Sequence, residues 1–231
     1  MRPTYISIVC LFAAFVLASC DATPSGKVEE ALKGFQRWND NVQQSAFSKT
    51  KRATKIADKD LTPESEFRTN SYDTDSPPSD TTENWRLFVT GLVKHPGYYS
   101  LAQIKELRKQ VQNSKHVCVE GWSQNIKWGG VALWCFLDWV GADSSAKYVG
   151  VECADKYYTG YDMASARHPE TLLCYEAFNK PLALKHGAPC RIVMPTKLGY
   201  KSAKWLVKLV VTNKKPGGYW EDQGYDWNAG L

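Results

Sequence analysis

Apolar residues recur along this chain with two different periods, and each period predicts one kind of element. Near the N-terminus Val28, Leu32, Phe35, Trp38 and Val42 follow one another at steps of three and four residues. This spacing predicts an amphipathic helix with one apolar stripe. Such a helix either docks onto a folded domain, which is the commoner case, or lies on a membrane surface.

Short apolar runs bounded by turn residues predict strands at residues 85–93, 114–119, 147–153, 171–178 and 205–212. Short helices are expected from 100 to 107, with Ser100 as the N-cap, and from 131 to 140, ending at Gly141. Helical patterns do not alternate with every strand. The order of elements therefore favours a mixed, strand-rich α+β single domain over a doubly wound parallel sheet.

The N-terminal pattern predicts a targeting segment at residues 1–20. An apolar stretch from Tyr5 to Ala18 follows Arg2, and Leu17-Ala18-Ser19-Cys20 reads as a bacterial lipobox with Cys20 as the lipidated residue. A plain secretory signal is the alternative. Either reading places the protein outside the cytoplasm, and Asp21 favours a periplasmic, lipid-anchored protein at the inner membrane. Residues 21–60 then form a helical linker and residues 61–231 the functional domain.

Composition narrows the functional classes. The 231 residues include 43% apolar residues, nine Trp and twelve Tyr, which predicts a globular domain with an aromatic-lined pocket. The formal charge of +5 comes from scattered residues without a basic run, so nucleic acid is not expected as a partner. Five cysteines remain once Cys10 leaves with the signal and Cys20 takes lipid. An odd number in an oxidising compartment leaves one thiol to explain.

Cys118 offers that explanation. It ends an apolar strand and faces a glycine-bearing turn within the stretch HVCVEGWSQNIKWGG, residues 116–130. A cysteine held there presents one soft thiolate to a metal from a fixed backbone. The alternative is a core cysteine, because free cysteine is among the most buried residue types.

A second group of residues suits an anion. His186, Arg191 and Lys204 are basic residues at strand edges or in glycine-bearing loops, and loop amides beside Gly187 and Ser202 add donors. Together they would form a cradle for a phosphate or pyrophosphate. The alternative is three separate surface charges. Asn70, in an earlier turn-rich stretch, suits either loop stabilisation or a ligand.

Several stretches together resemble a known family. FRTNSYDTDSPP, HVCVEGWSQNIKWGG, AKYVGVECADKYYTGYDM, HGAPCRIVMPTKLGYKSAKWL and PGGYWEDQGYDW occur in this order. In this combination they resemble the molybdopterin-binding domain of the sulfite oxidase family. The branch they resemble contains bacterial proteins similar to the catalytic subunit of periplasmic methionine-sulfoxide reductase. The likeness runs from about residue 61 to the C-terminus.

The resemblance implies roles for particular residues. Cys118 matches the catalytic cysteine whose thiolate binds molybdenum, and Arg191 matches an arginine that holds the cofactor phosphate. Cys153 falls where the reductase branch has a threonine that contacts the cofactor. The other positions implied to bind Mo-molybdopterin are Asn70, His186, Ser202, Ala203 and Lys204.

The resemblance also implies an activity, namely oxygen-atom transfer and within it the reduction of small-molecule or protein S-oxides. One alternative is oxidation of sulfite or a similar anion, for which Lys156, Arg167 and Lys201 are candidate substrate-facing cations. The other is a cofactor-free binding lipoprotein. The sequence contains no haem motif, so we expect a separate electron partner, either a membrane cytochrome or a soluble cytochrome c.

Overall fold

The computed structural model describes residues 26–71 and 84–231, so the lipidation site expected at Cys20 lies outside the described residues. Contacts divide the chain into two units, residues 1–45 and 46–231. Helix α2 (Lys27–Ala46) is the predicted amphipathic helix and accounts for the described part of the first unit. Across the described ranges, the structure contains no helix with the length and apolar content needed to cross a membrane.

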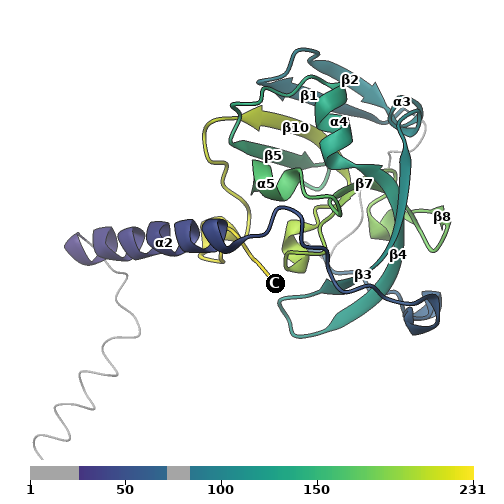
Figure 1. Ribbon diagram of the computed structural model, residues 1–231, viewed down its shortest axis with the longest axis horizontal. Helices are drawn as coiled ribbons and strands as arrows, with labels where there is room; N and C mark the ends of the chain where they lie inside the picture. Colours follow the sequence, from purple (N-terminus) through teal and green to yellow (C-terminus); the bar gives the residue numbers. More distant parts are fainter. Residues whose placement is uncertain (1–25, 72–83) are drawn as a thin grey trace, which may run out of the picture. The chain divides into compact units, whose positions relative to one another are not determined.

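The second unit contains two five-stranded sheets (Figure 1). The first has the order β2-β1-β10-β5-β6. Its strands β1 and β10 are parallel and its other pairs are antiparallel. The bounds are β1 (Arg86–Gly91), β2 (Gly97–Ser100), β5 (Tyr148–Cys153), β6 (Tyr158–Asp162) and β10 (Leu206–Thr212). Strands β1, β5 and β10 match the sequence prediction, whereas β2 and β6 were not predicted.

The second sheet has the order β3-β4-β7-β8, and β9 also pairs with β7. Figure 1 shows β3 and β4 as one long curved hairpin. The bounds are β3 (Lys109–Val117), β4 (Ser123–Ala132), β7 (Leu172–Ala177), β8 (Lys180–Pro181) and β9 (Arg191–Val193). These two sheets with few helices confirm the predicted mixed, strand-rich α+β class.

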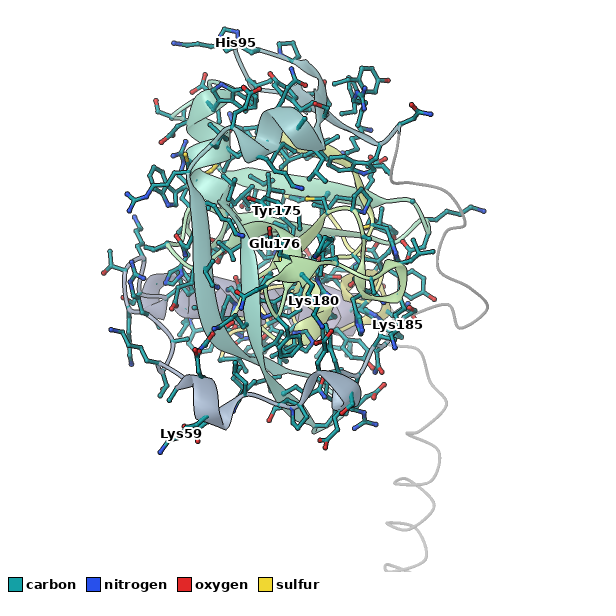
Figure 2. The ribbon with its side chains drawn as sticks, turned by 90° about the vertical axis from the view of Figure 1, so that its right-hand side faces the viewer. Lys59, His95, Tyr175, Glu176, Lys180 and Lys185 are labelled. Atoms are coloured by element: carbon teal, nitrogen blue, oxygen red, sulfur yellow. The ribbon has the colours of Figure 1, made fainter. Side chains whose placement is uncertain are left out.

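The two glycines that close the stretch at residues 116–130 lie inside β4. A Cβ on Gly130 would lie 2.2 Å from the Leu173 carbonyl oxygen of β7, so only glycine fits this approach. A Cβ on Gly129 would lie 3.0 Å from a carboxylate oxygen of Glu176. Glycine there leaves room for the Glu176–Lys109 ion pair, which joins β7 to β3 across β4. Figure 2 labels Glu176 on β7 beside the hairpin.

Short helices connect the strands. Helix α3 (Leu101–Lys105) begins at the predicted N-cap, Ser100. The Ser100 hydroxyl accepts from the Gln103 backbone amide, and the Gln103 side chain accepts from the Ser100 backbone amide, so the two residues form a capping box. Helix α4 (Leu133–Trp139) matches the prediction, and α5 (Met163–Ala166) begins after Asp162. The 3-10 helices are η1 (Asp58–Asp60), η2 (Glu64–Glu66), η3 (Leu184–His186), η4 (Gly199–Lys201) and η5 (Glu221–Gln223).

The larger core lies on the first sheet. It includes Leu87 and Val89 of β1, Phe136 and Leu137 of α4, and Leu209 of β10, all without exposed surface. A smaller core around Ile126, Trp128 and Leu172 lies under the second sheet. These cores fix the strands and loops that carry the functional side chains.

The compact domain begins earlier than the boundary expected at residue 61. Polar side chains of the β3–β4 hairpin hold the preceding segment: Asn113 donates to the Ile56 carbonyl at 3.0 Å, and Lys127 pairs with Asp58 at 3.0 Å. Asn125 donates to the Asp60 carbonyl at 2.8 Å. Hydrogen bonds and an ion pair, rather than apolar burial, hold this segment, which is why its polar sequence was assigned to the linker at residues 21–60.

Candidate active site

One cavity of the second unit collects most of the predicted site residues. Its walls come from residues 67–71, from the end of β3 and the turn after it, from η4 with the residues up to Lys204, and from the C-terminal segment around η5. Six predicted residues line it: Asn70, Cys118, Arg191, Ser202, Ala203 and Lys204. Asn70 and Lys204, which are 134 positions apart in sequence, therefore share one concave surface.

Cys118 is held by a tight turn directly after β3. Its amide donates to the Trp122 carbonyl at 2.8 Å, and the Gly121 amide donates back to the Cys118 carbonyl at 3.1 Å. Gly121 has a φ of 89°, in the left-handed region that favours glycine. The Asn70 side-chain amide lies 3.8 Å from the Cys118 sulfur and donates to it. The predicted strand end and glycine turn are thus the features that present the thiol.

Burial raises the pKa of the Cys118 thiol, and a backbone hydrogen bond from Glu120 partly offsets this rise. The metal-free thiol is therefore protonated at neutral pH. A metal cation bound there would displace that proton, since coordinating thiols are deprotonated. Within residues 26–71 and 84–231 no cluster of three or more His, Cys, Asp or Glu could hold a metal. A metal at Cys118 would take its other ligands from a cofactor or water.

Arg191 is a buried cation of the second sheet. Its guanidinium donates to the carbonyls of His186 and Ser202, each at 2.9 Å, and lies 5.0 Å from the Trp128 ring centroid. Burial lowers the pKa of Arg191 to about 10, which leaves it charged at neutral pH. The carbonyls and the ring hold the side chain in place without neutralising it.

Lys204 is the second cation. Its ammonium donates to the hydroxyls of Thr69 at 3.1 Å and Ser71 at 2.9 Å. Burial, with repulsion from Arg191, lowers the pKa of Lys204 to about 7. A Cβ on Gly187 would lie 3.0 Å from the Cβ of Lys204 and 3.2 Å from the Cβ of Arg191. Glycine at this position, which has a φ of 101°, therefore leaves room for both side chains.

The charge of this pair fits the phosphate of a molybdopterin. In the part of the chain that the structure describes, neither Arg191 nor Lys204 forms an ion pair with a carboxylate. Asp155 lines the same cavity and attracts Lys204, but the cluster remains basic. Two cations, one buried and one partly buried, favour a bound anion. A thiol and a basic cradle in one cavity are the donor set that the predicted cofactor requires.

Two predicted residues have their side chains elsewhere. The His186 ring stacks on Phe67 at a centroid distance of 3.7 Å, and burial lowers the pKa of His186 to about 4. Its contribution to the site is the carbonyl that orients Arg191. Cys153, the last residue of β5, faces the larger core with 5% exposure, and burial raises its pKa. Neither side chain is among those that line the cavity.

The cations suggested for an anionic substrate also lie away from the cavity. Lys201 pairs with Glu221 in the interior, and Arg167 pairs with Asp138 at 2.6 Å. Lys156 sits in the turn after β5 with a φ of 70° and does not line the cavity. All five cysteines of the domain are free thiols, so none of them is paired in a disulfide.

Sequence reasoning missed several of the residues that line the cavity. The Arg68 guanidinium lies 4.8 Å from the Trp122 ring centroid, and the Trp122 indole donates to Glu120 at 3.0 Å. Trp220 and Tyr225 reach the same cavity from the C-terminal segment. The richness in aromatic residues indicated a lined pocket, but not which rings line it.

This chain is similar to known oxidoreductases. Residues 74–220 match the family described as "Oxidoreductase molybdopterin binding domain". The chain is 42% identical over 216 residues to the "Putative protein-methionine-sulfoxide reductase subunit YedZ1" of Azospira oryzae, covering 93% of this chain and 82% of that protein. It is 33% identical to the protein-methionine-sulfoxide reductase catalytic subunit MsrP of Ralstonia nicotianae, over 59% of this chain.

The chain spans about half of such catalytic subunits, 46% of the Ralstonia protein and 53% of the one from Campylobacter jejuni. Among solved structures, the sulfane dehydrogenase SoxCD of Paracoccus pantotrophus matches with a TM-score of 0.56 at 20% identity, over 60% of this chain and 40% of that one. That likeness shows the fold. The family match covers more than half of the chain, and the chain therefore belongs to the molybdopterin-binding oxidoreductases of the sulfite oxidase family.

Proposed function

We propose that this protein reduces S-oxides at a mononuclear molybdenum–molybdopterin held in the cavity. One observation carries the proposal: a single cavity combines the Cys118 thiol with a buried cation, Arg191, and a partly buried one, Lys204, and neither pairs with a carboxylate of the described residues. When bound, the cofactor supplies oxygen-atom transfer together with electron exchange. The protein supplies orientation, charge and a shaped entrance.

Different residues of the cavity would bind the metal and the phosphate of the cofactor. Cys118 would ligate the metal as a thiolate, and the Asn70 amide, 3.8 Å from the sulfur, would stabilise that charge. Arg191 and Lys204 would bind the phosphate by charge-assisted hydrogen bonds. At the mouth, the Trp122 ring gives an S-oxide an apolar surface, and the Arg68 guanidinium above it offers donors to the sulfoxide oxygen.

The nature of the relatives supports a sulfoxide as substrate, since the reductases that match this chain are named for methionine sulfoxide in proteins. A peptidyl methionine sulfoxide is neutral at the reacting group. The cations considered for sulfite do not line the cavity, since Lys201 and Arg167 pair with Glu221 and Asp138 elsewhere.

We further propose that Cys20 carries lipid and holds the enzyme in the periplasm at the inner membrane. Leu17-Ala18-Ser19-Cys20 supports this placement. Electrons would then come from a membrane cytochrome, with a soluble cytochrome c as the alternative source. A relative described as a reductase subunit fits an enzyme that works with a separate partner.

Metal analysis combined with two assays tests the function. The protein, purified from a host that makes molybdopterin, should contain about one molybdenum per chain and should oxidise a reduced viologen dye with methionine sulfoxide. Sulfite-dependent reduction of ferricyanide should be far slower. A faster sulfite reaction would reverse the proposed direction, and a molybdenum-free protein would favour a binding lipoprotein.

Fractionation tests the anchor separately. Wild-type protein should remain with membranes after a high-salt wash, and labelled fatty acid should be incorporated. Cys20→Ser should lose the label. If the wild-type protein incorporates no fatty acid, Cys20 is not the lipidated residue.

A further inference from the structure

Helix α2 carries a contiguous apolar face. We call Val28, Leu32, Phe35, Trp38 and Val42 the α2 stripe; their exposed fractions run from 43% for Val42 to 70% for Phe35. The charged residues Glu29, Lys33 and Arg37 occupy the opposite side, where Lys33 and Glu29 pair one turn apart at 2.5 Å. Polar and apolar faces are therefore separated along the helix.

An exposed apolar stripe of this kind is stabilised when a partner or a membrane buries it. The helix has 20 residues, which corresponds to a length of about 30 Å. A lone helix of this size is only marginally stable in water, and most helical stability in proteins comes from packing of the apolar face. Contiguous exposed apolar surface on a protein usually marks a contact with a partner or a membrane.

The position of the stripe in the sequence favours a membrane. This step rests on the proposed lipidation of Cys20, seven positions before the first residue of the helix, Lys27. Seven extended residues span at most about 25 Å. A lipid at Cys20 would therefore keep the start of α2 close to the bilayer, and such tethering gives the stripe a high effective concentration of lipid.

The composition of the helix points the same way. Phe35 and Trp38 lie in the middle of the stripe, and amphipathic aromatic rings favour the level of the lipid headgroups. The helix contains three basic residues, Lys27, Lys33 and Arg37, and three acidic ones, Glu29, Glu30 and Asp40. Its net charge is therefore zero, and attraction to anionic lipid does not drive binding.

We propose that α2 lies in the plane of the membrane with its stripe in the boundary between headgroups and acyl chains. The helix is then a second membrane contact besides the lipid at Cys20. It limits how the enzyme domain can move, because the chain is held at the bilayer along the helix as well as at Cys20. Binding by apolar area alone predicts association with neutral phosphatidylcholine that salt does not weaken.

Depth-dependent quenching tests the placement of Trp38. The mature protein is bound to phosphatidylcholine vesicles whose acyl chains carry bromine, and its Trp fluorescence is compared with that of Trp38→Phe, which keeps the stripe apolar. The difference between the two proteins reports Trp38 alone. We expect the Trp38 emission to be quenched by brominated lipid and protected from aqueous acrylamide. Protection from both quenchers would mean that protein covers the stripe.

A matched pair of variants tests the stripe without the lipid. In a Cys20→Ser background, Phe35→Glu and Gln36→Glu add the same charge at neighbouring exposed positions, one inside the stripe and one outside. Phe35→Glu should reduce flotation with phosphatidylcholine vesicles by roughly tenfold, whereas Gln36→Glu should leave it unchanged. Equal flotation of the two variants would overturn the proposal, as would a dimer in sedimentation that Phe35→Glu dissociates.

These results are independent of the lipid itself. If Cys20 is not acylated but the stripe still binds vesicles, the contact stands and only the anchor fails. If Cys20 is acylated and Trp38 is not quenched by brominated lipid, the anchor stands and the contact fails.

Discussion

Lys201 and Glu221 form an ion pair in the interior of the domain, with side-chain exposures of 2% and 3%. The Lys201 ammonium also donates to the Gly160 carbonyl at 2.8 Å, and Thr159 donates to the same Glu221 oxygen at 2.5 Å. Lys201 belongs to η4 and Glu221 to η5, whose neighbours Tyr200 and Trp220 line the cavity. The pair therefore joins two walls of the site through β6.

We predict that Lys201→Met destabilises the protein by about 3–5 kcal/mol, because Glu221 is left buried without its counter-charge. Urea unfolding monitored by circular dichroism measures this change. Adding Glu221→Gln to Lys201→Met should recover part of the loss, since the second change removes the unpaired charge. A single variant as stable as the wild type would show that the pair does not hold the two walls.

Arg191→Ala should weaken retention of the cofactor while preserving the fold. A charge-assisted hydrogen bond contributes about 1.5–3 kcal/mol, which corresponds to roughly one to two powers of ten in retention. Molybdenum content per chain after extended dialysis measures the effect, and Arg108→Ala, at an exposed position, is the control. Equal molybdenum contents would show that Arg191 only orders the carbonyls of His186 and Ser202.

The part of the fold predicted from sequence consists of features that local chemistry determines. Ser100 was recognised as an N-cap because the capping bond spans three residues. Cys118 was recognised because a strand end and a glycine turn are adjacent in sequence. Strands such as β10 were recognised because their apolar residues are contiguous.

The features that escaped prediction depend on contacts between distant segments. Gly130 is inside a strand because β7 approaches it closely, and nothing near Gly130 in sequence reports this. The burial of Cys153 depends on which face of β5 meets the core. The His186 ring does not line the cavity because it stacks on Phe67, more than a hundred residues away in sequence. Only the His186 carbonyl contributes to the site, by accepting from Arg191.

Binding of a dianion should depend on pH through Lys204. Because burial lowers its pKa to about 7 in the folded protein, against about 10.4 for a free lysine, Lys204 loses its charge as pH rises above about 7. Sulfate stays dianionic over this range, so the affinity of cofactor-free protein for sulfate should fall roughly tenfold between about pH 6.5 and about pH 8. Stabilisation by sulfate in thermal unfolding, at ionic strength matched with chloride, measures the affinity.

The lowered pKa of Lys204 has the opposite effect on the folding stability of the sulfate-free protein, which should rise with pH. A lysine whose folded pKa is depressed favours the folded state more as it deprotonates, so this contribution to stability increases as pH rises through about 7. The Lys204→Gln variant should lose both dependences. If its response to sulfate changes with pH as the wild type's does, another group titrates in the cradle.

The thiol of Cys118 should be the metal ligand that the protein contributes. Compared with the cysteine thiol, the serine hydroxyl is a harder ligand, forms shorter bonds to metals and is far less acidic. The Cys118→Ser variant should therefore bind a thiolate-preferring metal poorly. The fold should survive, because the residue is only partly buried and the Asn70 amide remains as a partner for the new hydroxyl. Oxygen-atom transfer should be lost while far-UV circular dichroism stays near that of the wild type.

A second cysteine variant separates this role from simple burial. Cys135 of α4 is also partly exposed but does not line the cavity, so Cys135→Ser should keep both activity and metal environment. Molybdenum-edge X-ray absorption should show one sulfur neighbour fewer in Cys118→Ser than in Cys135→Ser. The pterin content of both variants should stay similar, since Arg191 and Lys204 are intact. The same sulfur count in the two spectra would exclude Cys118 as the ligand and leave it as an ordinary cysteine in the cavity wall.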